Sequence, residues 1–326
     1  FFDSNSNVGT GAFTVTVSGA LCNDFNVGSP TALDGAMTLA FGTTGSLTVS
    51  GSWTNQATNF SVTNTSGNLT FNATTTGKTI TTNGVTIGVT TTLNGVGGAW
   101  TLGSALNLST FSLTLTNGTF DTSVSNYAVT AGTFSSNNSN IRTINLNGST
   151  LSLSSSWTLT TSTNATLNAG TSTINLTANL ITFSGGSLTY YNVSFTSTTA
   201  TALTKTITGA NTFNNLTFST IGSAGLNNIT IGADQTINGT LTVNGSNGNR
   251  RMFVRSDTIG TSRTLTCAAI AAMTDVDFRD ITIAGAAGTL SGTRLGDCGG
   301  NSNITFVAGK TVYWNLAAGG NWNATA

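Results

Sequence analysis

The sequence predicts an all-β chain folded as a parallel β-solenoid (β-helix), an elongated body of about 13–16 coils at roughly 20–25 residues per coil. Three observations predict this class: charged residues make up only 6% of the chain, glycine accounts for 39 residues, and short apolar/polar alternations recur throughout. A typical soluble domain carries roughly 25% charged residues. Here Thr, Ser, Asn and Gly take their place, and these residues favour strands and turns over helices.

The alternating runs are the strand signal. In Phe13–Val17, Phe111–Leu115 and Leu241–Val243, apolar residues alternate with Thr or Ser, and Gly, Asn or Ser follows soon after. Alternation with a period of two is typical of a strand with one buried face. No stretch shows a sustained helical period, so we expect no helix longer than two turns.

One short pattern recurs along the chain. It consists of Asn, an apolar residue, Thr or Ser, and then Phe, and it occupies Asn68–Phe71, Asn192–Phe195, Asn215–Phe218 and Asn303–Phe306. The second and third copies are separated by roughly one coil of a β-helix. Stacked coils bury a continuous core that no single coil buries alone. We therefore expect the four Phe rings to be buried, in a rod on the order of 65–75 Å long at ~4.8 Å per coil.

Two other all-β architectures compete with the solenoid. The spacings of Trp53, Trp100 and Trp157 approach the blade length of a β-propeller, although their flanking residues share no pattern. Tandem immunoglobulin-like sandwiches also place strands at short intervals, but they normally carry more charge, and Pro at domain boundaries. This chain has a single Pro.

The predicted organisation is one continuous solenoid over residues 1–310, charge-poor over 1–249 and more charged over 250–310. Residues 311–326 are rich in aromatic residues and Gly. We expect this last segment, through Tyr313, Trp314 and Trp322, to cap the final coil or to dock a further module. The chain begins at Phe1 with no basic-then-apolar leader, so we expect a segment of a longer protein.

The composition leaves little material for catalysis. The chain has no His, its ten acidic residues are all Asp, and its net charge is zero. We therefore expect no enzyme and no cofactor. Nucleic-acid binding is not expected, because no extended basic stripe is present. Membrane insertion is not expected either, because no apolar run approaches the ~20 residues that span a bilayer.

The densest charged group is Asp275–Asp280. Alternation predicts that Val276 and Phe278 point inward, with Asp275, Asp277 and Arg279 together outside and Asp280 near the next corner. The simplest interpretation is a solvated ladder of paired charges. Calcium binding at Asp275 and Asp277 is a weaker alternative, since Ca²⁺ takes six or more oxygen ligands. Glycoside hydrolysis by this group is weaker still.

A second group is basic and precedes the first. Arg250, Arg251, Arg255 and Arg263, named here the arginine patch, are candidates for contact with an anionic glycan or a neighbouring subunit. The plainer interpretation is a coil boundary with solvent-facing side chains. Among the three cysteines, Cys267 alternates with Leu265 and is expected to point inward. The sequence leaves open whether Cys267 and Cys298 form a disulfide.

Several segments resemble the repetitive β-helix modules of very large bacteriophage virion proteins and bacterial surface proteins. They are residues 118–134, 169–174, 188–193, 207–216 and 235–239. Residues 275–280, 296–301 and 310–315 resemble the closing module of the phage examples.

The resemblance implies a structural or attachment role on a virion or cell surface, with neighbouring subunits, further modules or a cell-surface glycan as partners. It implies no catalytic residue. A bacterial adhesin or secreted passenger is the alternative, and a polysaccharide-active β-helix enzyme is a weaker one.

Overall fold

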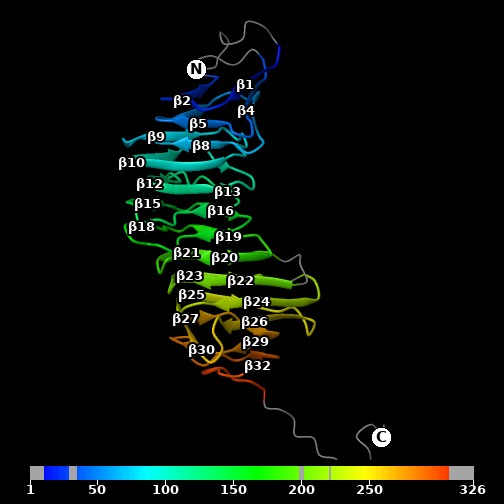
Figure 1. The fold of residues 1–326 in the computed structure, drawn as a ribbon. Coiled ribbons are helices and arrows are strands. Elements are labelled where there is room, and N and C mark those ends of the chain that lie inside the picture. The colour runs from blue at the N-terminus through cyan, green and yellow to red at the C-terminus, as the bar shows by residue number, and fades with distance from the viewer. Residues whose placement is uncertain (1–10, 29–34, 198–201, 220–221, 308–326) are drawn as a thin grey trace, which may run out of the picture.

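The computed structural model describes residues 11–28, 35–197, 202–219 and 222–307. Within them the chain forms a parallel β-solenoid of about 12 turns with no helices, which confirms the predicted fold class. Figure 1 shows the turns stacked in chain order, from β1 (Phe13–Val17) and β2 (Ala20–Cys22) at one end to β32 (Gly296–Asp297) at the other. Segments one turn apart in sequence therefore lie side by side.

The strands form four sheets. The largest contains β2, β3 (Phe25–Val27), β5 (Ser46–Val49), β6 (Trp53–Asn55), β8 (Asn68–Phe71), β9 (Lys78–Thr81), β10 (Thr90–Leu102), β12 (Leu113–Asp121), β14 (Phe134–Ser135), β15 (Arg142–Asn145), β17 (Trp157–Thr158), β18 (Ala165–Asn168), β20 (Leu180–Ser184), β22 (Ala202–Thr208), β24 (Gly225–Ile231), β26 (Arg250–Ser256), β29 (Val276–Arg279) and β32. The nine-stranded sheet contains β11 (Leu106–Asn107), β13 (Val129–Ala131), β16 (Thr150–Leu153), β19 (Thr173–Leu176), β21 (Thr189–Phe195), β23 (Thr212–Phe218), β25 (Gln235–Val243), β27 (Arg263–Ile270) and β30 (Ile281–Ala284). The two small sheets are β1 with β4 (Met37–Phe41) and β7 (Phe60–Asn64), and β28 (Met273–Thr274) with β31 (Gly292–Thr293).

The long strands β10 and β12 bend round a corner of the solenoid. The register between them shifts between Leu93 and Ala99, where an extra segment bulges out. Gly95 and Gly98 lie in this bulge, and a Cβ on either would collide with the carbonyl oxygen of Ala73 in the turn before. Glycine is thus required there because two backbones approach closely.

The repeated tetrapeptide marks equivalent positions of successive turns. Asn192–Phe195 pairs in register with Asn215–Phe218. The Phe195 and Phe218 rings stack with centroids 4.7 Å apart, and the Asn215 amide donates to Asn192 Oδ1 at 2.9 Å. The predicted one-coil spacing is therefore confirmed.

The expected burial of the four Phe rings is confirmed for three of them. Phe71, Phe195 and Phe218 are buried, whereas Phe306 is only half-buried. Phe306 packs against the core and lies 6.4 Å from the Phe278 ring, centroid to centroid. It belongs to the last residues that the structure describes, so no later described turn covers it.

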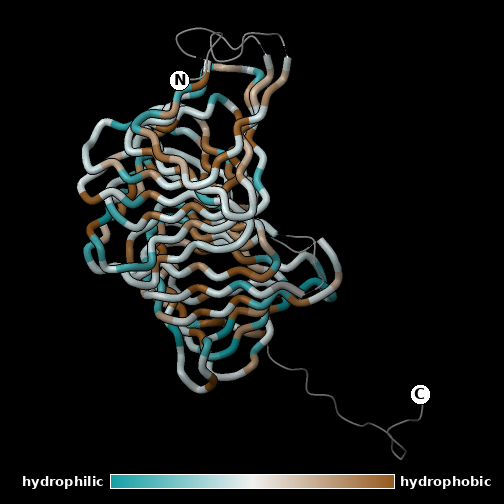
Figure 2. Tube along the Cα trace, turned by 45° about the horizontal axis from the view of Figure 1, so that its top comes forward, coloured by the Kyte–Doolittle hydropathy of each residue, from teal (hydrophilic) through white to brown (hydrophobic). Residues whose placement is uncertain are grey.

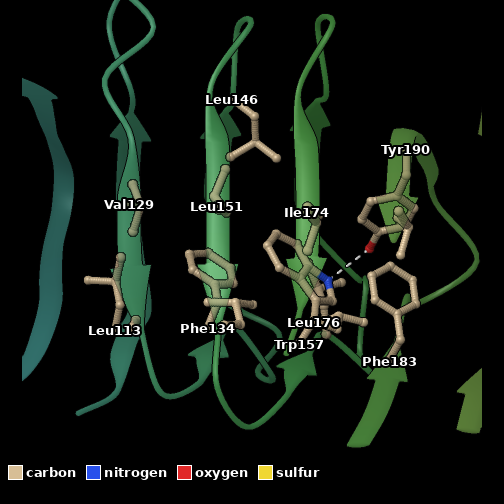
Figure 3. Packing of buried hydrophobic residues seen from close by; sticks show 14 of the residues in the cluster. Leu113, Val129, Phe134, Leu146, Leu151, Trp157, Ile174, Leu176, Phe183 and Tyr190 are labelled. Carbon is tan, nitrogen blue, oxygen red and sulfur yellow. Dashed lines mark hydrogen bonds between the residues drawn. The ribbon is translucent and has the colours of Figure 1, made fainter. Parts of the chain in front are cut away.

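The tryptophans belong to the core and do not mark propeller blades. Trp53, Trp100 and Trp157 are fully buried. Trp157 stacks on Phe134 at a centroid distance of 4.4 Å, and its Nε1 donates to the Tyr190 hydroxyl at 3.1 Å, as Figure 3 shows. In Figure 2 hydrophobic residues alternate with polar ones along the turns, as expected for strands with one inward face.

The turn count is lower than predicted. The sequence suggested about 13–16 coils, and the described chain has about 12. The number of residues per turn varies because corners carry loops of different length: partners in neighbouring strands range from Arg263 with Ile281 to Gln235 with Leu265. At ~4.8 Å per turn the stack is roughly 58 Å long.

The alternation of faces can be tested on β23, where Leu216 is 1% exposed and Thr217 is half-buried on the outer side. Leu216→Asp places an unpaired charge in the core, so it should lower the free energy of unfolding by more than about 3 kcal/mol. Thr217→Lys should change it by less than about 0.5 kcal/mol. Urea denaturation followed by circular dichroism measures both, and equal shifts would contradict the assigned faces.

Candidate functional site

The charged residues gather on the last turns of the solenoid. Strand β29 pairs with β26 so that Val276 lies on Met252 and Phe278 lies on Val254. All four side chains are buried, which confirms the predicted inward orientation of Val276 and Phe278. The alternate residues of the two strands therefore point outward. They include the charged residues Arg251, Arg255, Asp277 and Arg279.

Asp275 is not solvated as predicted. It lies at the corner before β29, with φ +57° and its side chain fully buried. Its carboxylate pairs with the part-exposed side chains of Arg251 and Arg294, which cover it, and its left-handed conformation is one that Asp tolerates better than most residues. Asp280 lies at the corner after β29, with φ +54°. The sequence predicted this position near a corner.

Two arginines pair with the buried carboxylate of Asp275. Arg294 Nη2 lies 2.6 Å from Asp275 Oδ2, and Arg251 Nη1 lies 3.3 Å from Asp275 Oδ1. Arg251 also pairs with Asp277 at 2.5 Å. The hydrogen bond from Arg294, aided by the charges of both arginines, lowers the pKa of Asp275 below its ordinary value although burial opposes the shift.

This charge cluster (Arg251, Asp275, Asp277 and Arg294) joins three successive turns. Arg251 belongs to β26, the two carboxylates belong to the next turn, and Arg294 lies at the corner before β32. Arg251 Nη2 also donates to the carbonyl oxygen of Arg294 at 2.9 Å. Because both carboxylates accept hydrogen bonds from guanidinium groups, a calcium ion at Asp275 and Asp277 would have to displace those arginines. The described residues contain no group of three or more metal-ligating acidic or Cys side chains.

The arginine patch is divided in the structure. Arg251 belongs to the charge cluster, and Arg263 pairs with Asp257 at 2.7 Å. For Arg250 and Arg255, no side-chain hydrogen bond or ion pair is found within the described part of the chain. Arg255 lies beside Arg279 in the ladder, and the Arg279 guanidinium lies 5.8 Å from the centre of the Phe253 ring. Two of the four arginines therefore remain available for a partner.

The cysteines are not bridged. Cys22, Cys267 and Cys298 are free thiols, so the Cys267–Cys298 disulfide that the sequence left open does not form here. Cys267 is buried, as predicted, and burial raises its pKa to about 12. The predicted capping residues Tyr313, Trp314 and Trp322 lie outside the described residues.

Sequence reasoning missed two buried cations. The first, Arg142, is 1% exposed and pairs with no carboxylate of the described chain. Its guanidinium donates five hydrogen bonds: to Ser136 Oγ, and to the carbonyl oxygens of Ser136, Asn140, Thr161 and Thr163. These acceptors lie in two loops of successive turns. Arg142 therefore fastens together two corners that lack strand pairing of their own.

The second buried cation is Lys205, whose side chain is fully buried. Lys205 lies in the ladder between Ile181 and Ile229, and its Nζ donates to Asn227 Oδ1 at 3.1 Å. Burial lowers its pKa to about 8.

The sequence did contain a signal for both residues. Each is separated by one residue from an inward isoleucine, Ile144 for Arg142 and Ile207 for Lys205, and they are the only charged residues between Asp121 and Asp234.

No family model, no curated protein and no solved structure matches the chain. Among the described residues, no helix is long and apolar enough to cross a membrane.

The charge cluster can be tested by neutralising its buried carboxylate. Asp275→Asn should lower the free energy of unfolding at pH 7 by about 1.5–3 kcal/mol, because charge-assisted hydrogen bonds to two arginines are lost. The control is Asp234→Asn: Asp234 is exposed and its carboxylate accepts from the Thr264 backbone N–H, a bond that an amide oxygen also makes.

The pH dependence gives a second readout for Asp275. Its pKa is lowered in the folded state, so its contribution is present above the ordinary Asp value of about 3.9 and is lost as the pH falls through the lowered pKa. Melting temperatures measured from about pH 2 to 6 should converge for wild type and Asp275→Asn at the acidic end. A constant difference across this range would contradict the pairing.

Arg142 should be irreplaceable by lysine. Arg142→Met leaves four carbonyl oxygens without their donor and should cost about 3 kcal/mol or more in unfolding free energy. Arg142→Lys keeps the charge but has a single nitrogen, which cannot reach acceptors spread over two loops, so it should not restore stability. Arg250→Met is the matched control. Thermal unfolding of the three variants measures the effect, and full rescue by lysine would show that the fork of hydrogen bonds is unimportant.

Proposed function

We propose that the chain is a non-enzymatic structural element of a bacteriophage virion surface or fibre, a rigid module that contacts neighbouring subunits or further modules. One observation carries this proposal: a single inward ladder runs through about 12 turns. A fold of this kind makes a stiff rod whose length grows with turn number.

The use of charge supports a structural role. In the charge cluster, carboxylates and guanidiniums neutralise one another across turns, and Arg142 binds carbonyl oxygens of the chain itself. Catalytic carboxylates in glycosidases instead face a substrate across an open gap. The cluster is thus suited to holding turns together.

A second role, contact with an anionic cell-surface glycan, is favoured by one feature. Arg250 and Arg255 both lie on β26, and the described part of the chain offers neither an ion-pair partner. Guanidinium groups without a partner are suited to carboxylate or sulfate groups. In a bacterial surface adhesin, the alternative context, these two guanidinium groups would serve the same purpose.

The proposal can be tested by locating the chain. Antibodies against it should label purified phage particles under the electron microscope, and labelling of bacterial surfaces alone would favour the adhesin. Release of reducing ends from polysaccharides incubated with the chain would contradict the non-enzymatic role.

The glycan contact can be tested separately. The double variant Arg250→Gln, Arg255→Gln should reduce retention on immobilised heparin, a sulfated probe, whereas Arg263→Gln should leave retention nearly unchanged because Arg263 is already paired with Asp257. Equal loss in both variants would show nonspecific attraction.

A further inference from the structure

The burial of Lys205 in this core is energetically unfavourable. Lysine is almost never fully buried unless it is paired with a carboxylate, because an unpaired ammonium loses its hydration. The described residues provide no ion pair for Lys205, and its neighbours in the ladder are Ile181 and Ile229. Within the described chain, its side chain donates one hydrogen bond, to the side-chain amide of Asn227.

The side-chain amide of Asn227, which contacts Lys205, lacks one of its hydrogen-bond partners within the described chain. It lies on β24, in the turn after Lys205, and is fully buried. Its Oδ1 accepts from Lys205 Nζ, but its Nδ2 has no hydrogen-bond partner among the described residues. Buried amide groups are nearly always paired. A buried amine without a counter-ion and a buried amide without an acceptor thus lie in contact.

We propose that Lys205 and Asn227 form a covalent isopeptide bond between adjacent turns. The Lys205 Nζ attacks the Asn227 Cγ, a C–N bond forms, and the bond from Cγ to Nδ2 breaks. The leaving nitrogen takes a proton from the attacking amine and departs as ammonia. The step needs no oxidant, reductant or co-reactant. In the product, one secondary amide replaces both the buried ammonium and the unpaired Nδ2.

The surroundings favour this reaction in two ways. Attack requires the neutral amine, and burial lowers the pKa of Lys205 to about 8, so a substantial share is neutral near pH 8. The fold also holds amine and amide in contact, which replaces a bimolecular encounter by an intramolecular one. Lys205 and Asn227 make no contact with a carboxylate that would relay the proton, within the part of the chain described here, so we expect slow formation, faster at pH 9 than at pH 6.

The mass of the intact chain tests the proposal. After the folded protein is held at pH 9, it should have lost the mass of one ammonia. Because trypsin does not cleave after an acylated lysine, and Lys205 is the only basic residue between Arg142 and Arg250, a denatured digest should contain residues 143–250 as one piece. Chymotrypsin should then release a branched peptide that joins Lys205 to Asn227.

Matched variants exclude other sources of ammonia loss, such as succinimide formation at the Asn-Gly sequences. Lys205→Arg and Asn227→Ala should each abolish the mass loss and restore cleavage after residue 205. Asn228→Ala, a change at the neighbouring half-buried position, should retain the bond. If the wild-type chain keeps its full mass and is cleaved after Lys205, or if the mass loss survives in Lys205→Arg, the proposal is wrong.

Discussion

The parallel hydrogen-bond ladder between successive turns is the constraint on which the rest of this structure depends. Each strand pairs with the strand one turn before and one turn after, so its register fixes which side chains enter the core. A slip of one residue would turn every inward Leu, Ile and Phe outward. The stacked pairs Phe195 with Phe218 and Asn192 with Asn215 show register enforced on both faces at once, by ring stacking inside and amide hydrogen bonding outside.

The ladder also explains how the chain manages with so little charge. Between Asp121 and Asp234 the only charged residues are Arg142 and Lys205, and both are buried. The outer surface of these turns relies on polar side chains that bond along the stack. Asn168 donates to Asn145 at 2.8 Å, and Asn145 donates to Asp121 at 3.0 Å. Because an amide carries both a donor and an acceptor, Asn145 bonds to the turn before it and to the turn after it.

Sequence alone predicted the fold well, because the solenoid follows from local alternation and from the repeat length. The inward placement of Val276, Phe278 and Cys267 came from the same rule. The rule was incomplete at corners: Asp275 was expected to be solvated and is buried, because Arg251 and Arg294 cover its carboxylate. The alternation rule could not predict the ion pairs of Asp275 either, since Arg251 and Arg294 contact Asp275 only after three turns are stacked. Arg142 and Lys205 were overlooked although alternation places them inward.

The middle turns and the last turns of the solenoid are consequently held by different forces. The middle turns depend on apolar burial, amide ladders and the hydrogen bonds of the buried Arg142, which salt affects little. The last turns depend partly on the charge cluster, where the Arg294 side chain remains 57% exposed and its partner Asp275 is fully buried. Salt screens an exposed guanidinium far more than it screens a buried pair, so the stability of this end is set by ionic conditions as well as by packing. The last turns, which carry the charge cluster together with Arg250 and Arg255, therefore depend on ionic strength more than the middle turns do.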